Sequence, residues 1–221
     1  MNGRAPILAF LRTGRWFAGL PPALQELIVQ RATVERFVRG QFLIEQGTSP
    51  KGMYAVLDGT VRVTRRIADG RDLLVHVGSA GFWVGDYGTI SGQTTIGSTM
   101  AETPVRALFL PAAEFERIVD DEPRHFRPFM NLLLDRYRSA FAFVAELQGL
   151  PSEARLWRRI EGIASFWRDG APAGTPIDIP ISQGELAQMV GLSRQRLSTL
   201  LGRLEAQGLI EVGFRNVRVV A

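Results

Sequence analysis

Residues 181–204 read ISQGELAQMVGLSRQRLSTLLGRL, and this stretch decides the fold of the C-terminal part of the chain. Ser182 and Glu185 have the spacing of a capping box, in which the serine accepts from the Glu185 amide and the glutamate accepts from the serine amide. A helix is therefore predicted over 183–190, and Gly191 supplies the tight turn that ends it.

A second helix follows at once, capped by Ser193 and predicted over 194–206. Its buried side consists of four leucines: Leu197, Leu200, Leu201 and Leu204. The residues left outward are Arg194, Gln195, Arg196, Ser198, Thr199, Gly202 and Arg203. No acidic residue occurs between positions 186 and 204, so the outward face of this helix-turn-helix suits a major groove lined by phosphates.

Beyond the second helix, residues 209–212 and 217–220 are two apolar runs joined by residues 213–216. This pattern predicts a β-hairpin wing, with Arg215 placed to meet a backbone phosphate. The alternative is a small helical hairpin with a solvated arginine face. The capping box, the glycine turn, the second cap and the trailing hairpin together favour a winged helix-turn-helix that binds double-stranded DNA.

The composition of the 221 residues excludes several classes of site. There is no cysteine, so disulfides, thiolate zinc sites, iron–sulfur clusters and cysteine nucleophiles are excluded. The two histidines, His76 and His125, lie far apart, so a histidine-rich metal centre is not expected. No apolar run approaches the roughly twenty residues of a membrane span. The net charge of +4 permits a nucleic-acid partner without arguing for one, and a cytoplasmic protein is expected.

Residues 33–110 have the pattern of a β domain. Short β-rich runs at 42–44, 53–57 and 61–64 alternate with glycine turns, which is typical of a compact β-sandwich or barrel. A short amphipathic helix is predicted before this domain, over residues 23–30.

After residue 111 the pattern becomes helical. One short helix is predicted over 112–119, and the acidic run 120–122 before Pro123 is typical of a new helix start. Apolar residues then recur at alternating steps of four and three, as in a coiled-coil seam: Phe126, Met130, Leu133, Tyr137, Ala140, Val144 and Leu147. This seam predicts a dimer, and the alternative is a helix that packs only on its own β domain.

A domain boundary is expected at residues 149–151, Gly-Leu-Pro, which break the long helix. A helix over 152–169, a loop over 170–176 and a short extended piece over 177–180 then lead into the capping box.

Three motifs carry a resemblance to the CRP/FNR family of bacterial regulators: LA at 186–187, GLSR at 191–194 and LEAQGLI at 204–210. The N-terminal part agrees through FAGL at 17–20, GQFLI at 40–44, QG at 46–47 and MYAVLDG at 53–59. The resemblance covers nearly the whole chain.

The resemblance implies an α+β protein in three parts. These are a β-roll sensor domain of the double-stranded β-helix or jelly-roll type over 1–120, a coiled-coil dimerisation helix over 121–149 and a winged helix-turn-helix over 150–221. Members of the family are usually homodimers that read palindromic promoters, with half-sites one helical turn apart. An activator of this kind would also contact RNA polymerase.

The family's cyclic-nucleotide cassette departs from its usual pattern in this chain. It normally has a glutamate that meets the ribose and an arginine, followed by serine or threonine, that meets the cyclic phosphate. The corresponding effector-pocket candidates are Gly85, Asp86, Tyr87, Gly88, Thr95 and Ile96. Aspartate thus replaces the glutamate, and threonine replaces the arginine. Since a charge-assisted hydrogen bond contributes about 1.5–3 kcal/mol, cyclic AMP is not expected to bind with regulatory affinity.

Other effectors are constrained in the same way. A haem would need an axial ligand, and His76 is the only histidine of the β region, where a strand histidine in a satisfied hydrogen bond is favoured. An uncharged or weakly polar effector, or no effector at all, stays open.

The residues expected to contact DNA follow from the family's recognition helix. Arg194, Gln195 and Thr199 are expected to read bases, with Arg194 on a guanine and Gln195 on an adenine. The residues assigned to phosphates are Ser193, Arg196, Arg203 and Arg215. The family commonly has glutamate and arginine at the second and third base-reading positions, so a different half-site is expected.

Two other classes of protein compete with a ligand-gated regulator. One is an effector-independent repressor, which the altered cassette allows. The other is a cupin-type metalloenzyme fused to a DNA-binding tail, but such a barrel needs clustered histidines and a carboxylate, and the β region has one histidine. No catalytic residues and no metal site are therefore expected.

Overall fold

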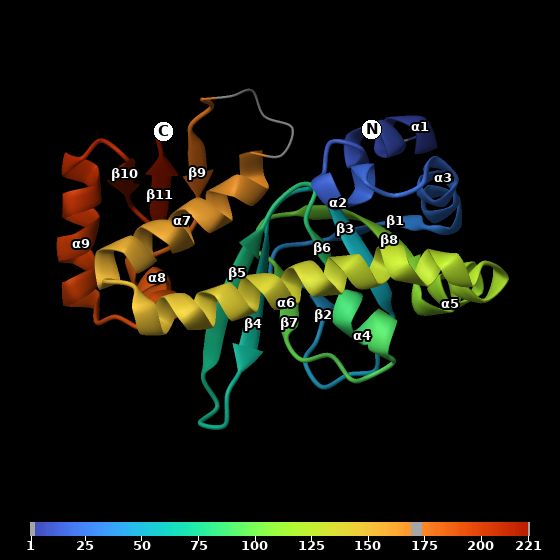
Figure 1. Ribbon diagram of the computed structural model, residues 1–221, viewed down its shortest axis with the longest axis horizontal. Coiled ribbons are helices and arrows are strands. Elements are labelled where there is room, and N and C mark those ends of the chain that lie inside the picture. Colours follow the sequence, from blue (N-terminus) through green and yellow to red (C-terminus); the bar gives the residue numbers. More distant parts are fainter. Residues whose placement is uncertain (1–2, 169–173, 221) are drawn as a thin grey trace.

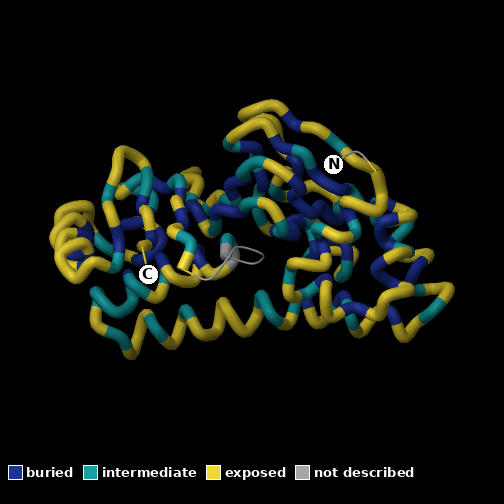
Figure 2. Tube along the Cα trace, turned by 90° about the horizontal axis from the view of Figure 1, so that it is seen from above, coloured by how far each residue is buried: buried dark blue, intermediate teal, exposed yellow. Residues whose placement is uncertain are grey.

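The computed structural model describes residues 3–168 and 174–220. A long helix, α6 (Phe126–Gly149), runs along one side of the molecule and joins a β-rich N-terminal part to a mainly helical C-terminal part (Figure 1). Seen from above, most of its second half is exposed (Figure 2). This order of parts confirms the predicted α+β fold.

Three short helices precede the first strand: α1 (Arg4–Leu11), α2 (Arg15–Ala18) and α3 (Pro22–Arg31). The helix predicted over 23–30 corresponds to α3, whereas the sequence pattern does not predict α1 and α2. Their side chains Ile7, Leu11 and Phe17 are buried in one cluster with Leu24 of α3 and Met53 of the β domain. The N-terminal helices therefore belong to the core of the β-rich part.

The β-rich part is a roll of two four-stranded antiparallel sheets, with the strand orders β1-β8-β3-β6 and β2-β7-β4-β5. The first sheet contains β1 (Thr33–Phe37), β3 (Gly52–Asp58), β6 (Trp83–Val84) and β8 (Val105–Pro111). The second contains β2 (Phe42–Ile44), β4 (Val61–Arg66), β5 (Asp72–Gly78) and β7 (Ser98–Ala101), and α4 (Asp86–Ser91) follows β6.

Strand β3 is buried on both faces, which explains its unbroken apolar sequence. Met53, Ala55 and Leu57 pack toward the N-terminal helices, while Tyr54 and Val56 lie in the cluster between the two sheets. The alternation follows from the two-residue period of a strand.

The acidic run 120–122 does not begin the long helix, contrary to expectation. Asp120 and Asp121 end α5 (Ala112–Asp121), and Glu122 is extended, with φ −139°. A single 3₁₀ turn, η1 (Pro123–His125), then leads into α6, which starts at Phe126. Proline at the first position of the 3₁₀ turn has no amide to donate, so the chain can restart there.

The C-terminal part consists of α7 (Ser152–Arg168), β9 (Ile177–Ile179), α8 (Gln183–Val190), α9 (Arg194–Ala206), β10 (Ile210–Gly213) and β11 (Asn216–Val219). The loop predicted over 170–176 falls mainly on residues 169–173, which lie outside the described residues. The three strands pair antiparallel in the order β10-β11-β9, so the predicted hairpin wing is confirmed.

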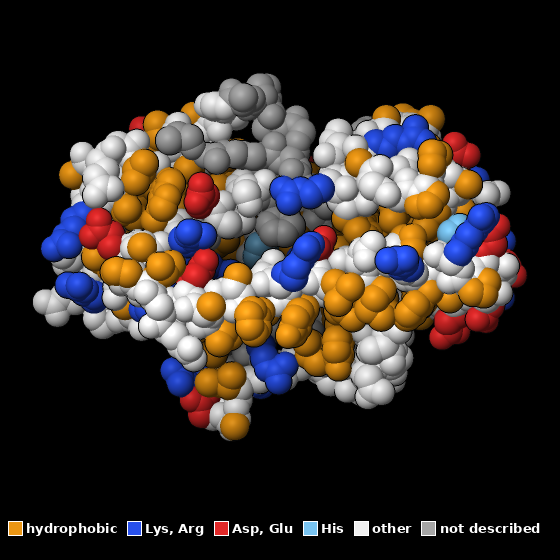
Figure 3. Space-filling model, viewed as in Figure 1, with side chains coloured by type: hydrophobic (Ala, Val, Ile, Leu, Met, Phe, Trp, Pro, Cys, Tyr) orange, Lys and Arg blue, Asp and Glu red, His pale blue; other side chains and the backbone are white. Residues whose placement is uncertain are grey.

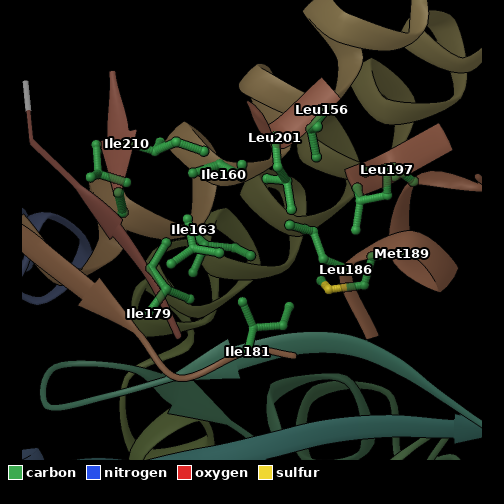
Figure 4. Packing of buried hydrophobic residues seen from close by; sticks show 14 of the residues in the cluster. Leu156, Ile160, Ile163, Ile179, Ile181, Leu186, Met189, Leu197, Leu201 and Ile210 are labelled. Carbon is green, nitrogen blue, oxygen red and sulfur yellow. The ribbon is translucent and has the colours of Figure 1, made fainter. Parts of the chain in front are cut away.

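The predicted capping box is also confirmed. The Ser182 amide donates to Glu185 Oε2 at 2.8 Å, and the Glu185 amide donates to Ser182 Oγ at 3.3 Å. Behind it, Leu186, Leu197 and Leu201 turn toward one another between the helices (Figure 4).

The C-terminal core extends into the β-roll. Leu74 and Val77 of β5 belong to the same buried cluster as the leucines of α8 and α9. Trp167 Nε1 donates to the Val77 carbonyl at 3.3 Å, and the Arg159 guanidinium donates to the carbonyl of Val75. The C-terminal part is therefore packed directly on strand β5.

Candidate DNA interface and effector region

The turn between α8 and α9 sets the direction of the second helix. Gly191 has a φ of 67°, a left-handed conformation that glycine adopts without steric cost. Ser193 then caps α9, because its Oγ accepts from the Arg196 amide at 3.2 Å. The four predicted leucines are buried on one side of α9, each at most 2% exposed. The opposite side is left free for a partner.

The exposed face of α9 carries the residues predicted to contact DNA. Ser193, Arg194, Gln195, Arg196 and Thr199 are all exposed. Neither Arg194 nor Arg196 forms an ion pair with any residue in the described ranges. Thr199 Oγ1 donates to the Gln195 carbonyl within the helix at 3.2 Å. The first turns of α9 therefore present two uncompensated positive charges.

The position of Arg194 depends on a glycine in the preceding helix. A Cβ built on Gly184 would lie 2.9 Å from Nη2 of Arg194, closer than side chains normally approach. The Arg194 guanidinium thus lies over the first turn of α8, in space that a larger residue would occupy. This contact is a positioning feature that no local pattern in the sequence indicates.

Arg203 and Arg215, both predicted to meet phosphates, have different surroundings. Arg203 Nη1 lies 3.2 Å from Glu153 Oε2 of α7, so its charge is partly compensated. Arg215 forms no ion pair among the described residues and has a φ of 53° at the tip of the β10–β11 hairpin. Its neighbour Phe214, which the sequence pattern did not single out, is 96% exposed.

The first half of the cassette lies at the end of β6 and the start of α4. Gly85 is left-handed, with φ 88°, and a Cβ there would collide with the Gly52 carbonyl. Asp86 is buried, and its Oδ2 lies 3.5 Å from Nε of Arg136 on α6. Tyr87 is half-buried and Gly88 is buried. The Asp86 carboxylate is therefore occupied by the long helix.

The second half of the cassette is occupied as well. Thr95 is buried, and its Oγ1 donates to the carbonyl of Glu45 at 2.5 Å. Ile96 is 50% exposed. Gly88 and Thr95 lie side by side, because a Cβ built on Gly88 would be 3.5 Å from Cγ2 of Thr95. Ile96, in contrast, faces solvent.

The cavity beside Thr95 has a volume of about 110 Å³. This is small compared with the roughly 300–1,000 Å³ of typical ligand pockets. Lys51 and Tyr54 also line it, and Lys51 is a cation that the cassette itself lacks. Burial, followed by the nearby charge of Glu35, raises the pKa of Tyr54 to about 12, so this phenol is neutral at ordinary pH.

His76 lies in β5 and is half-buried. The His76 ring stacks on the Phe82 ring, with 4.7 Å between their centroids. The Arg136 guanidinium lies over the Phe82 ring, also 4.7 Å from its centroid. Burial, together with the charges of Arg136 and Arg159, lowers the pKa of His76 to about 3. A neutral imidazole stacked on Phe82 is compatible with a structural role, and the hydrogen bond expected for His76 stays a prediction.

A buried arginine joins the β-roll to the helix-turn-helix. The Arg62 side chain is 8% exposed, and its Nε lies 2.7 Å from Glu102 Oε2. Its other nitrogens contact the Glu185 carboxylate and the Pro180 carbonyl, the latter at 3.2 Å. Burial alone would raise the pKa of Glu185, but the hydrogen bonds from Ser182 and the charge of Arg62 outweigh burial and lower it.

The ion pairs of Arg62 have no sequence signal, because Glu185 lies 123 positions away. A cavity of about 260 Å³ opens beside them, between β4, β5 and α8. Its lining pairs two arginines, Arg62 and Arg66, with two acids, Asp72 and Glu185.

The predicted dimer seam lies along α6. Met130 and Leu133 are half-buried, Ala140 is exposed, and Tyr137, Val144 and Leu147 are 64%, 51% and 41% exposed. Phe126, Leu134 and Phe141 add to the exposed apolar side chains of this helix. In Figure 3 hydrophobic side chains gather along α6 on the face toward the viewer.

Two further properties of the described residues bear on partners. No group of three or more histidine, cysteine, aspartate or glutamate side chains within the described ranges is placed to hold a metal ion. Among the described helices, none combines the length and hydropathy that crossing a membrane requires.

Two family models match the chain. Residues 34–122 match the cyclic nucleotide-binding domain, and residues 154–221 match the Crp-like helix-turn-helix domain. Together the two matches span more than two thirds of the sequence.

Similar proteins span nearly the same length. The CRP-like cAMP-activated global transcriptional regulator of Mycobacterium tuberculosis is 22% identical over 203 residues, 92% of this chain and 91% of the relative. FixK2 from Bradyrhizobium japonicum superposes with a TM-score of 0.71 at 18% identity, covering 86% of this chain and 93% of its own. The c-di-GMP responsive global regulator CLP of Xanthomonas campestris gives a TM-score of 0.67 at 21% identity, covering 91% and 100%.

Proposed function

Because the chain belongs to the CRP/FNR family of DNA-binding transcription regulators, we propose that it acts as a homodimer that reads a palindromic promoter site without gating by cyclic AMP. The observation that carries the DNA-reading role is the exposed face of α9, where Arg194 and Arg196 have no carboxylate partner among the residues that the structure describes. The family match indicates a regulator and not an enzyme.

The proposed division of labour follows the three parts of the chain. Residues 1–120 would be the sensor, 121–149 the dimerisation helix and 150–221 the DNA-binding domain. Within the last, we assign base reading to Arg194, Gln195 and Thr199, and phosphate contacts to Ser193, Arg196, Arg203 and Arg215. If the protein activates transcription, RNA polymerase is a further partner.

Selection from a random duplex library tests the DNA assignment. The purified protein should enrich a palindrome whose half-sites lie about one helical turn apart. Arg194 should select a guanine, and Gln195 an adenine. Enrichment of the half-site typical of the family, or of no sequence at all, would contradict the assignment.

The homodimer is supported by the apolar stripe on α6. Tyr137, Phe141 and Val144 are each more than half exposed, and large apolar side chains in a continuous row are characteristic of an interaction surface. Sedimentation should give a dimer for the full chain and a monomer for Phe141→Glu. Ser139→Glu, an exposed change on the same helix, is the control and should stay dimeric.

The absence of cyclic AMP gating is supported by the state of the cassette. Thr95 stands where the phosphate-binding arginine would be, its hydroxyl is engaged by Glu45, and Asp86 is paired with Arg136. The missing charge-assisted bond corresponds to about one to two decades of affinity. Calorimetric titration should give no binding heat at micromolar concentrations, and a low-micromolar dissociation constant would contradict the proposal.

An effector-independent regulator is the second candidate. It is favoured because the polar side chains of the cassette already have partners within the protein: Thr95 donates to the Glu45 carbonyl, and Asp86 pairs with Arg136. DNA affinity measured with and without a small-molecule cell extract separates the two candidates. A change of affinity supports an effector, and an unchanged value supports the effector-independent form.

A further inference from the structure

The tip of the β10–β11 hairpin has two unusual features, and the assignments above use only the charge of Arg215. Gly213 pairs with Asn216, so Phe214 and Arg215 alone form the turn. Phe214 is 96% exposed, the most exposed large apolar side chain among the described residues. Arg215 is the only non-glycine residue in the described ranges with a positive φ, 53°. An arginine in this strained conformation points to a selected function for the tip.

The hairpin holds this tip rigidly with respect to the recognition helix. Strand β11 is paired on both sides, and Val217 and Val219 are buried, at 1% and 0% exposed. The Val212 amide donates to Glu205 Oε1 of α9 at 2.9 Å. Figure 1 shows β10 and β11 beside α9 at the end of the molecule away from the N-terminal helices. The position of α9 on a partner therefore fixes the position of the hairpin tip.

The tip of the hairpin itself carries a positive charge. Behind the turn, a single cation, Arg218, lies 3.6 Å from Glu211 and 3.8 Å from Asp178, so it compensates only one of these two acids. Arg215 itself has no acidic partner among the described residues. The tip therefore offers one bare aromatic ring beside one free cation. The narrow minor groove attracts arginine by its negative potential, and apolar side chains pack into it between base steps.

We propose that Phe214 and Arg215 enter the minor groove next to the major groove that α9 occupies. This inference rests on the proposed DNA-reading function of α9. Phe214 would pack against sugars and base edges, while Arg215 lies along the groove. DNA is the favoured partner of the tip, rather than protein, because the hairpin is tied to α9 and its free charge is positive.

The contact has a consequence for sequence preference. In the minor groove a G·C pair carries the guanine 2-amino group, which an A·T pair lacks. A ring packed on the groove floor would meet that group. The wing should therefore favour A·T pairs in the segment flanking the half-site that α9 reads.

The test uses the full chain and a duplex selected by the wild-type protein. Phe214→Ala should weaken binding about tenfold, with an unchanged melting temperature because the side chain makes almost no contact in the protein. It should leave the salt dependence unchanged, whereas Arg215→Ala should reduce the salt slope by about one. Val38→Ala, which removes a 70% exposed apolar side chain from the β-roll, is the matched control and should bind normally.

A base-analogue experiment locates the contact. Inosine replaces guanine without the 2-amino group, so I·C resembles A·T in the minor groove and G·C in the major groove. Changing flanking G·C pairs to I·C should strengthen binding of the wild type about as much as changing them to A·T, and should not affect Phe214→Ala. Arg215→Gly should weaken binding while keeping or raising thermal stability, because glycine relieves the backbone strain.

Three results would overturn the inference. One is binding by Phe214→Ala within twofold of the wild type, and another is indifference of the wild type to I·C substitution. The third is a drop in thermal stability of Phe214→Ala that equals its loss of binding. If the wild type enriches no duplex at all, the proposed function itself fails, and the inference fails with it.

Discussion

The β-roll and the recognition helix treat their charged side chains in opposite ways. Within the roll, Arg62 is buried between two carboxylates and Asp86 is paired with Arg136. On α9, Arg194 and Arg196 are exposed and have no acidic partner in the described part of the chain. Groups that are already paired inside the protein stabilise it, while groups left free are available to a ligand. The difference supports the proposed DNA-binding role of α9 and the proposed structural role of the altered cassette.

At constant pH, the largest effect should come from breaking the buried pairs. Arg62→Met leaves Glu102 and Glu185 without their shared cation and should lower the free energy of unfolding by about 3 kcal/mol, measured by urea denaturation. Arg39→Met is a matched control, because Arg39 also faces Glu102, at 3.7 Å, but is 76% exposed. It should cost at most about 0.5 kcal/mol. Equal effects for the two variants would remove the distinction between buried and free arginines.

The next largest effect is a loss of DNA binding that leaves the stability of the protein unchanged. Arg194→Ala should weaken DNA binding about ten- to a hundredfold, because a bidentate contact to guanine is lost, and should leave unfolding by urea unchanged. Arg117→Ala removes the same charge from exposed α5, where the side chain is 64% exposed, and should bind normally. If both variants weakened binding alike, net charge and not a specific contact would explain the loss.

A smaller change in the free energy of unfolding, counted per pH unit, is expected from the titration of His76. Burial lowers the pKa of His76 from 6.5 to about 3, so below pH 6.5 the unfolded chain takes up a proton that the folded chain does not. Stability is thus fully present above pH 6.5 and falls by about 1.4 kcal/mol per pH unit on acidification toward pH 3. Urea denaturation across this range should show a shallower fall for His76→Gln. Parallel curves would mean that the imidazole is accessible to protons.

The smallest effect should come from Arg196, which we assign to a phosphate. Arg196→Ala should weaken binding to all sequences uniformly, by a factor of about three to ten, and reduce the salt slope by about one. Fluorescence anisotropy over a salt series measures both quantities. A loss restricted to one base position would instead make Arg196 a base-reading residue.

Local patterns predicted most elements of the fold, and distance along the chain explains what they missed. The capping box needs only Ser182 and Glu185, three positions apart, and it forms as expected. Helix α1 was missed because its buried residues, Ile7 and Leu11, are too few to give a clear period. Glu185 shows the limit most clearly, since its contact with Arg62 spans 123 positions.

The candidate sites follow the same rule. The exposed face of α9 was predictable because four leucines define its opposite side. The Arg136 partner of Asp86, 50 positions away, was not, and neither was the presence of Lys51 in the cavity that Thr95 lines. Phe214 could have been found, because an aromatic residue in a two-residue turn has no neighbour to cover it.

Leu74 and Val77 belong to the β-roll but complete the C-terminal core, and this limits where the chain can be cut into fragments that fold. A fragment cut at residues 149–151 would keep its helices but lose the strand that completes its core, and Glu185 would lose its arginine. Figure 4 shows Ile181 facing that strand. The DNA-reading part is consequently not a transferable module. A chimaera that brought it to another sensor would have to carry β5 with it, or supply apolar residues of matching shape.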